Sequence, residues 1–312
     1  MNFDAVLIAG PTASGKTQAA IALAEAIGGT IVNADSMQVY RELPVLSAQP
    51  SAAERSRVPH GLFGHISAFE RYSVGRYIAD ASSTLNTVRR QERIPVFVGG
   101  TGLYFRALVH GLADLPAVPL PVRNEIRARL KEIGQDALYS ELQASDPLSA
   151  SRIRPSDTQR LLRATEVFAA TGRPFSDWQR DQIQPVLHSL KLAKVVLDVP
   201  RAELRHRIAA RFERMLHLGA SEEAANLAEL NSSLPAAKAL GLRELLAAAR
   251  GEISETEASQ KAILRTCQFA KRQMTWFRNQ MADWVWTTAD PVNGKFISQI
   301  MDDFKRKLLD GA

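Results

Sequence analysis

The sequence of 312 residues has one cysteine and no long apolar run. Because Cys267 has no second cysteine to pair with, an intramolecular disulfide and a cysteine-rich metal site are both excluded, and a reducing compartment is expected. No stretch approaches the roughly 18 consecutive apolar residues of a membrane-spanning helix, and no charged-then-apolar leader precedes the first apolar segment. We therefore expect a cytoplasmic protein that does not associate with a membrane.

Acidic side chains are outnumbered, and one long stretch near the C-terminus has none. The sequence has 33 Asp and Glu against 39 Lys and Arg, a formal charge of +6 that favours a polyanionic partner. Residues 258–282 contain no acidic residue, and their basic residues are Lys261, Arg265, Lys271, Arg272 and Arg278.

This stretch has the periodicity of an amphipathic helix. One face would carry Lys261, Arg265, Gln268 and Arg272, and the residues expected to pack inward are Ile263, Leu264, Met274 and Phe277. A helix of a single charge sign beside Trp276 is typical of contact with a nucleic-acid backbone.

The N-terminal segment contains a phosphate-binding loop. It matches the pattern G-x-x-x-x-G-K-[ST] at every constrained position with Gly10, Pro11, Thr12, Ala13, Ser14, Gly15, Lys16 and Thr17. The apolar run 5–9 before it and the periodic segment 16–27 after it predict the strand, loop and helix that the pattern requires. Loop N–H groups and Lys16 can hold a di- or triphosphate, and the Thr17 hydroxyl can ligate Mg²⁺.

Three further apolar segments predict strands that end in polar residues. The segment 30–35 ends at Asp35, the segment 94–98 leads into the turn 99–101, and the segment 194–199 contains Asp198. Ligands of open parallel sheets bind outside the C-terminal ends of the strands, so Asp35 would share a cleft with the phosphate loop, and the turn 99–101 would lie at the same edge of the sheet. Asp35 and Asp198 are rival candidates for an acting carboxylate, and a helix cap is the structural alternative for Asp35. We expect Asp35 to act, because the polar residues 36 and 38 follow it.

A helix is also predicted over 202–218. Its basic residues Arg207, Arg211 and Arg214 are spaced i, i+4 and i+7. Such a stripe reaches phosphates if the helix points into the cleft, and is a solvated face otherwise.

Composition changes at residues 115–121, where three prolines predict a linker. The following segment lacks strand candidates and has helical periodicity at 122–133, 136–144 and 157–171. We therefore expect an α/β fold with a P-loop NTPase-like parallel sheet flanked by helices. Residues 1–121 and 188–312 would form this core with its basic C-terminal helices, and residues 122–187 an inserted helical lobe that contacts nucleic acid.

Taken together, these segments resemble the bacterial tRNA dimethylallyltransferase family, also called isopentenyl-diphosphate:tRNA transferases. The resemblance covers nearly the whole chain and rests on GPTASGKT (10–17), DSMQVYR (35–41), VFVGGTGLY (96–104), DTQRLLRATEVF (157–168), RHRIAARFERML (205–216), LGLREL (240–245) and QFAKRQMTWFR (268–278). It implies transfer of a dimethylallyl group from dimethylallyl diphosphate to N6 of adenosine 37 in the tRNA anticodon loop, with Mg²⁺ as cofactor. We expect the enzyme to be a monomer.

The resemblance also implies roles for individual residues. Asp35 would be the base at N6, Thr101 would assist at the reacting centre, and the loop 10–17 with Arg207 would hold the diphosphate. Lys16 would act in catalysis as well as in binding, and Thr17 would ligate the metal. The implied tRNA contacts are Asp35, Ser36, Met37, Gln38, Thr101, Arg123, Gln159, Arg160, Leu161, Leu162, Arg163, Lys238, Arg243, Lys271, Arg272 and Gln273. The chain departs from common family residues at Gln49, Leu242 and Cys267.

The residues by themselves leave two other functions open. A kinase of a small metabolite would use the same loop for ATP, although the basic C-terminal helix argues against it. A nucleotide switch or an RNA-binding protein without catalysis would leave Asp35 and the turn 99–101 without a role. Conversion of tRNA to a heavier product with dimethylallyl diphosphate and no ATP would separate the three.

Overall fold

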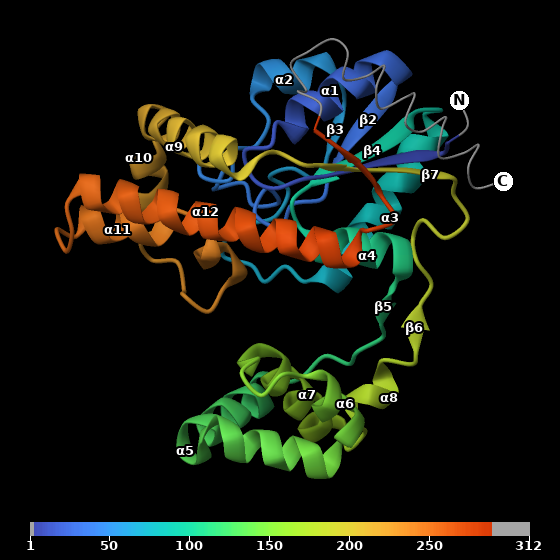
Figure 1. Ribbon diagram of the computed structural model, residues 1–312, viewed down its shortest axis with the longest axis vertical. Coiled ribbons are helices and arrows are strands. Elements are labelled where there is room, and N and C mark those ends of the chain that lie inside the picture. The colour runs from blue at the N-terminus through green and yellow to red at the C-terminus, as the bar shows by residue number, and fades with distance from the viewer. Residues whose placement is uncertain (1–2, 289–312) are drawn as a thin grey trace. The chain divides into compact units, whose positions relative to one another are not determined.

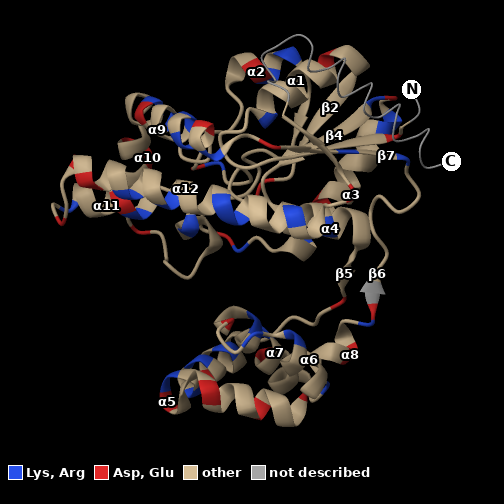
Figure 2. Cartoon of the chain, viewed as in Figure 1, with Lys and Arg blue, Asp and Glu red and all other residues tan. Residues whose placement is uncertain are grey.

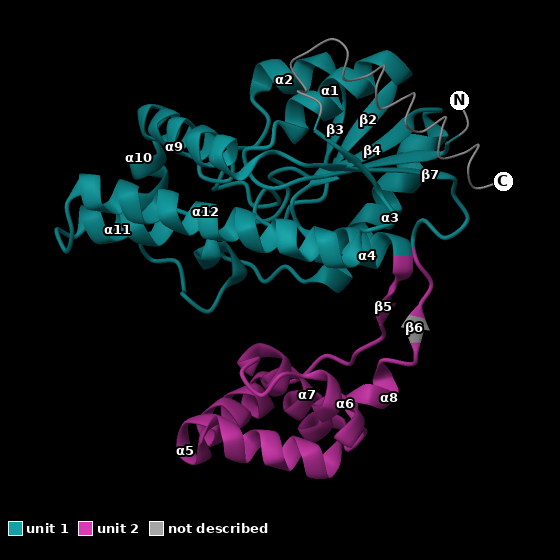
Figure 3. Cartoon of the chain, viewed as in Figure 1, with its two compact units in different colours: residues 1–109, 186–312 teal, residues 110–185 magenta. Residues whose placement is uncertain are grey.

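The computed structural model describes residues 3–288, which form two compact units. Unit 1 comprises residues 1–109 and 186–312, and unit 2 comprises residues 110–185 (Figure 3). Unit 2 thus begins before the boundary expected at residue 122, because β5 (Leu112–Ala113) and β6 (Gln182–Ile183) pair with each other antiparallel. The expectation that residues 122–187 contain no strand is wrong, because β6 lies within this range. A strand of two residues is too short to produce the alternating pattern by which strands are predicted from sequence.

Unit 1 is built on a six-stranded parallel sheet with helices on both faces (Figure 1). The strands in spatial order are β3 (His60–Gly61), β2 (Gly29–Asn33), β4 (Ile94–Gly99), β1 (Ala5–Ala9), β7 (Leu192–Leu197) and β8 (Val285–Thr287). In the middle of the sheet, Ile8 of β1 is level with Val98 of β4 and Val195 of β7. Every residue of β1 is buried, as expected for a continuous apolar strand covered on both faces. The predicted parallel α/β sheet is confirmed.

Successive strand residues enter two different apolar clusters, because their side chains alternate across the sheet. Leu7 and Phe97 belong to the cluster under α3, α4 and α12, whereas Val6, Ile8 and Val98 belong to the cluster under α1. The helices of unit 1 are α1 (Lys16–Ile27), α2 (Ala52–Arg57), α3 (Val74–Arg90), α4 (Gly102–His110), α9 (Arg201–His217), α10 (Ala220–Ala225), the 3₁₀ helix η1 (Pro235–Lys238), α11 (Leu242–Ala249) and α12 (Glu255–Gln280).

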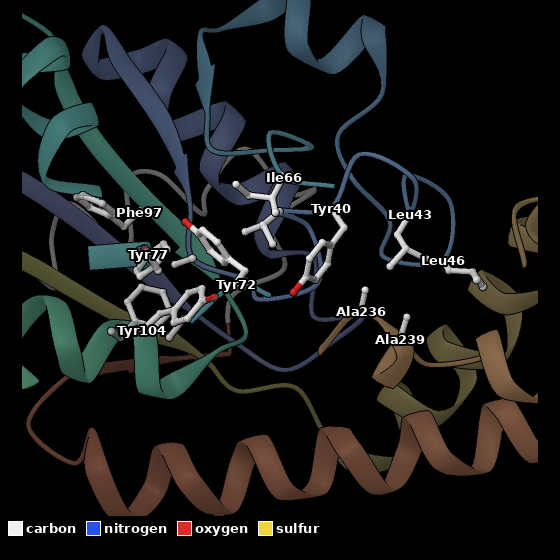
Figure 4. Packing of buried hydrophobic residues seen from close by; sticks show 14 of the residues in the cluster. Tyr40, Leu43, Leu46, Ile66, Tyr72, Tyr77, Phe97, Tyr104, Ala236 and Ala239 are labelled. Atoms are coloured by element: carbon white, nitrogen blue, oxygen red, sulfur yellow. The ribbon is translucent and has the colours of Figure 1, made fainter. Parts of the chain in front are cut away.

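Several tyrosine side chains belong to the larger of these apolar clusters, including Tyr40, Tyr72, Tyr77 and Tyr104 (Figure 4). Tyr77 and Tyr104 stack with ring centroids 3.7 Å apart and planes inclined by 8°. The Tyr77 hydroxyl donates to the Asn33 carbonyl at 3.1 Å, which satisfies a buried polar group and fixes the end of β2.

Unit 2 is helical apart from β5 and β6. It contains α5 (Leu120–Ser145), α6 (Pro147–Arg152), α7 (Thr158–Thr171) and α8 (Phe175–Trp178). The helix α5 bends at Gly134, whose φ of 80° is incompatible with a continuous helix. Leu138 and Leu142 of α5 pack against Leu161 of α7 in a small separate core. Within residues 3–288, no helix is both long and apolar enough to cross a membrane.

Candidate functional site

One cavity of about 940 Å³ is lined by the phosphate loop, the segment after β2 and one side of α9. Its lining includes Thr12, Ala13, Gly15, Lys16 and Thr17 of the loop, Asp35 and Gln38 after β2, residues 44, 45 and 47–52, and Arg207, Arg211 and Arg214 of α9. The sequence thus predicted a shared cleft at the C-terminal ends of strands, and the structure brings those segments together.

The backbone conformation of the phosphate loop requires glycine at position 15. Gly15 immediately precedes α1 and has a φ of 85°, and Ala13 also lies in the left-handed region with a φ of 62°. The Ser14 N–H donates to the Pro11 carbonyl at 3.2 Å, closing the turn. A left-handed residue at a helix N-terminus directs successive N–H groups toward one point, which suits an anion.

Lys16 is the buried cation of this loop. Its side chain is only 9% exposed and its Nζ donates to the Pro11 carbonyl at 3.2 Å. Burial lowers the pKa of Lys16 from 10.5 to about 8, the Asp35 carboxylate opposes that change, and Arg211 adds to it. Lys16, Asp35 and Arg211 therefore interact within the same cavity.

Arg211 lines the cavity, although the sequence gives it no role beyond membership of the arginine stripe on α9. Burial lowers the pKa of its guanidinium, Asp35 opposes this, and Arg214 adds to it. Arg207, which the family resemblance favoured, also lines the cavity, but it is paired with Glu203 one turn earlier in α9. The i, i+4 spacing of arginines was the available signal for Arg211, and the rotation of α9 about its axis decides which of them faces the cleft.

Hydrogen bonds with Asn33 and Met37 hold Asp35 in place. Its N–H donates to Asn33 Oδ1 at 2.8 Å, and its Oδ1 accepts from the Met37 N–H at 3.0 Å. Asn33 is fully buried and its Nδ2 also donates to the carbonyls of Asp35 and Leu62. The carboxylate is therefore preorganised where it enters the cavity.

Thr101 contacts Ser36, the residue that follows Asp35, and does not line the cavity. Its Oγ1 accepts from the Ser36 N–H at 2.9 Å and lies 3.2 Å from Ser36 Oγ. The turn fits closely here because a Cβ on Gly99 would come within 2.0 Å of the Ala34 carbonyl oxygen. Among the described residues, the cavity lining includes Asp35 but neither Thr101 nor Asp198.

Several residues predicted to contact tRNA are exposed in unit 1, where Figure 2 colours Lys and Arg positions blue along α9 and α12. These are Lys238, Arg243, Lys271 and Arg272. Ser36 and Met37 are half-buried, and Gln38 donates through Nε2 to the carbonyls of Ser47 and Ala48 at 3.0 and 2.7 Å. Gln273 is 6% exposed and hydrogen-bonds within the protein.

The uncompensated basic face predicted for α12 needs correction. Lys261 pairs with Glu257 at 2.7 Å, and Arg265 pairs with the buried Glu244 of α11 at 2.5 Å. Both partners lie outside the acid-free window, so counting charges within it overstated the basic character. Leu264, expected to pack inward, is 58% exposed.

The three departures from common family residues have separate environments. Gln49 lines the cavity, donates to the Tyr40 carbonyl at 2.7 Å and accepts from Arg55 at 2.9 Å. Leu242 is 2% exposed in the main core, and Cys267 is half-buried.

In unit 2, the structure brings Arg123 and Arg163 close together. Burial lowers the pKa of Arg163, and the charge of Arg123 lowers it further. Gln159 and Arg160 are exposed and Leu162 is half-buried, whereas Leu161 is fully buried in the core, so its side chain does not reach the surface.

A metal would find few protein ligands at the candidate site. Across residues 3–288 there is no group of three or more His, Cys, Asp or Glu side chains arranged to hold an ion. The Thr17 hydroxyl in the cavity wall is suited to Mg²⁺, which commonly takes one or two protein oxygens and completes its shell with phosphate and water.

Sequence comparison identifies the family. A model of the IPP transferase family matches residues 38–280, and a model of isopentenyl transferases matches residues 3–58. The chain belongs to the IPP transferase family. Within this family, the tRNA dimethylallyltransferase of Nitrobacter hamburgensis is 47% identical over 289 residues, covering 92% of this chain and 91% of the relative. The tRNA dimethylallyltransferase of Azorhizobium caulinodans is 48% identical over 288 residues, covering 92% of each chain.

Solved structures of IPP transferases have the same fold. The full-length tRNA isopentenylpyrophosphate transferase of Bacillus halodurans superposes with a TM-score of 0.69 at 30% identity, covering 98% of this chain and 97% of the other. A eukaryotic dimethylallyltransferase acting on tRNA superposes with a TM-score of 0.79 at 26% identity, covering 97% of this chain and 79% of the other. The family resemblance drawn from the sequence motifs is confirmed, and the kinase alternative is not favoured.

Proposed function

We propose that this IPP transferase transfers a dimethylallyl group from dimethylallyl diphosphate to N6 of adenosine 37 in tRNA, releasing diphosphate. The names of relatives at 47% and 48% identity support prenyl transfer to tRNA. One observation carries the chemistry: a carboxylate, Asp35, shares a single cavity with a phosphate loop and its buried Lys16. As part of this proposal, the enzyme acts on tRNA in the cytoplasm and as a monomer.

The phosphate loop binds the diphosphate. Loop N–H groups and Lys16 neutralise its oxygens, and Arg207 and Arg211 approach from α9. The Thr17 hydroxyl would hold a Mg²⁺ ion, which would supply further positive charge beside the diphosphate. These cations matter most as the carbon–oxygen bond to the diphosphate breaks, because the leaving group gains negative charge in that step.

Asp35 acts on the adenine. Its lone pairs accept a hydrogen bond from the N6 amino group, whose own lone pair is delocalised into the ring and is a weak nucleophile. As the N6–carbon bond forms, the amino group loses a proton to Asp35 and the electrons of the breaking carbon–oxygen bond leave with the diphosphate. Thr101 assists by holding Ser36, which follows Asp35 directly.

The adenine reaches this cavity only if it leaves the stacked anticodon loop, because the reacting amino group is otherwise shielded. Polar side chains at Ser36 and Gln38, with Met37 between them, line the approach to the extruded nucleotide. The remaining contacts to tRNA come from Lys238, Arg243, Lys271 and Arg272 in unit 1, and from Arg123, Gln159, Arg160, Leu162 and Arg163 in the inserted helical unit.

Mass spectrometry of the tRNA product tests the proposal. Incubation with unmodified tRNA and dimethylallyl diphosphate, without ATP, should add one five-carbon unit at adenosine 37. A requirement for ATP, or phosphorylation of a small molecule, would instead favour the kinase alternative.

Single-turnover transfer by two matched variants tests the base. Asp35→Asn keeps the shape of the side chain but cannot accept a proton, so the rate should fall by roughly 10²- to 10⁴-fold with little change in tRNA affinity. Asp198→Asn, the same substitution at another strand end, should retain most of the rate. The opposite pattern would assign the base to Asp198.

A further inference from the structure

A single buried glutamine connects α12 to both sides of the candidate site. Gln273 Oε1 accepts from the Thr12 N–H of the phosphate loop at 2.9 Å. Its Nε2 donates to the Gly100 carbonyl, in the turn that follows β4, at 2.8 Å. The side chain is 6% exposed, and its neighbours Lys271 and Arg272 are exposed.

The turn is shaped to receive this helix. A Cβ on Gly100 would lie 2.3 Å from Gln273 Nε2, and a Cβ on Gly102 would lie 2.2 Å from the ring of Trp276, one turn further along α12. Real Cβ atoms do not approach this closely, so both contacts require glycine. The same Cβ on Gly100 would lie 3.2 Å from Asp35 Oδ2, so the amide of Gln273 and the carboxylate of Asp35 both border Gly100.

Glutamine is suited to this position because one planar group carries an acceptor at one corner and donors at the other. The amide oxygen of Gln273 accepts from the Thr12 N–H of the phosphate loop. The amide nitrogen donates to the Gly100 carbonyl, in the turn that carries Thr101. The contacts join residues 261 and 173 positions apart in the sequence. These two bonds fix the distance between the loop that holds the leaving group and the turn beside the base.

We propose that Gln273 is a positioning residue for the transfer step and that its side chain does not contact tRNA. This inference rests on the proposed function, because it assigns Gln273 to the alignment of the diphosphate with Asp35. A displacement of about 1 Å between reacting groups can cost about 10²-fold in rate. Loss of either bond should therefore reduce kcat more than it reduces tRNA affinity.

The first test replaces the amide by an apolar side chain of similar length. Gln273→Met removes both hydrogen bonds and leaves the Thr12 N–H and the Gly100 carbonyl unpaired. We expect kcat to fall by about tenfold or more and KM for dimethylallyl diphosphate to rise, while Kd for tRNA changes by less than about twofold. Gln260→Met, at an exposed position on the same helix, is the matched control and should leave all three constants unchanged.

The second test replaces Gln273 by glutamate, which can hydrogen-bond to the Gly100 carbonyl when protonated and repels that oxygen when ionised. In Gln273→Glu, the protonated carboxyl offers the same acceptor and donor as the amide, whereas the ionised form presents an oxygen to the Gly100 carbonyl and to Asp35. Asp35 borders Gly100 beside this side chain, and Lys16 and Arg211 are the cations that interact with Asp35. The ratio of variant to native kcat should therefore rise as the pH is lowered, compared at pH values where Tm shows that the variant is folded.

The outcomes separate the inference from the function on which it rests. An increase in Kd for tRNA with unchanged kcat in Gln273→Met would overturn the positioning role, as would a pH-independent kcat ratio for Gln273→Glu. If the native enzyme transfers no dimethylallyl group to tRNA, the proposed function fails instead. Measurement of Tm identifies an unfolded Met variant, in which case the pH-dependent ratio decides.

Discussion

Raising the pH should weaken binding of the diphosphate substrate, because the buried Lys16 loses its charge near pH 8. Its pKa is lowered from 10.5 to about 8, chiefly by burial. Lowering a pKa by that amount corresponds to about 3 kcal/mol against the charged form in the folded, ligand-free protein. The full penalty is present below pH 8, where Lys16 is charged in the folded and unfolded states alike.

The direction of the stability change follows from proton counting. Between about pH 8 and pH 10.5 the unfolded chain keeps a proton at this lysine that the folded protein has lost, so Lys16 makes the ligand-free protein more stable as pH rises through this window. A bound diphosphate reverses the preference, because its negative charge favours the ammonium form. Binding above pH 8 must therefore take up a proton.

Linkage then gives the magnitude. If the diphosphate restores an ordinary lysine pKa, its Kd should rise by about 20-fold between about pH 7.5 and pH 9.5. Isothermal titration in buffers of different ionisation enthalpy measures both the Kd and the proton uptake. Lys16→Arg keeps a positive charge throughout this range, so its Kd should be nearly independent of pH. A flat profile for the native protein, or an equal slope in Lys16→Arg, would refute this role of Lys16.

Two further predictions concern tRNA binding and the cavity wall. Replacing Lys271 and Arg272 by alanine should lower the log–log salt slope of tRNA binding by about one per lost phosphate contact, whereas Lys261→Ala, already paired with Glu257, should change it little. Unchanged slope and affinity in the double variant would contradict the proposed interface. Glu223 accepts from the N–H groups of residues 45 and 46 at 2.7 and 2.8 Å, so an amide at this position must turn a donor toward one of them. Glu223→Gln should destabilise this part of the wall by about 1–3 kcal/mol and raise KM for the diphosphate, and an unchanged Tm and KM would count against it.

The phosphate loop could be predicted because its function depends on local backbone conformation. Gly15 with a φ of 85°, the buried strand before it and the helix after it are all encoded within residues 5–27. The same reasoning extends to the segment after β2, since parallel topology brings strand ends to one edge of the sheet. In these parts of the site, the relevant contacts are formed within a short segment or follow directly from the order of parallel strands.

Contacts between distant segments could not be predicted from periodicity. The sequence predicts an uncompensated basic face that includes Arg265, because the buried Glu244 that pairs with it belongs to a different helix. The family resemblance implies a tRNA contact for Gln273 beside the exposed Lys271 and Arg272, yet the rotation of α12 turns Gln273 inward. Arg211 likewise depends on how α9 packs, and the buried Ile208 and Phe212 on that helix set this rotation.

Sheet pairing, rather than strand pattern, determines where the two strand-end carboxylates lie relative to the cavity. Asp198 directly follows β7, and its N–H donates to the Thr287 carbonyl of β8 at 2.8 Å, so its backbone still belongs to the sheet ladder. Its carboxylate lies 3.9 Å from Arg278, outside the residues that line the cavity. Asp35 follows β2 after one further residue, and a side chain, Asn33, takes over the bonds that a neighbouring strand would make. Release from the ladder is what allows the Asp35 carboxylate to enter the cavity, whereas the sequence favours Asp35 only through the polar residues 36 and 38 that follow it.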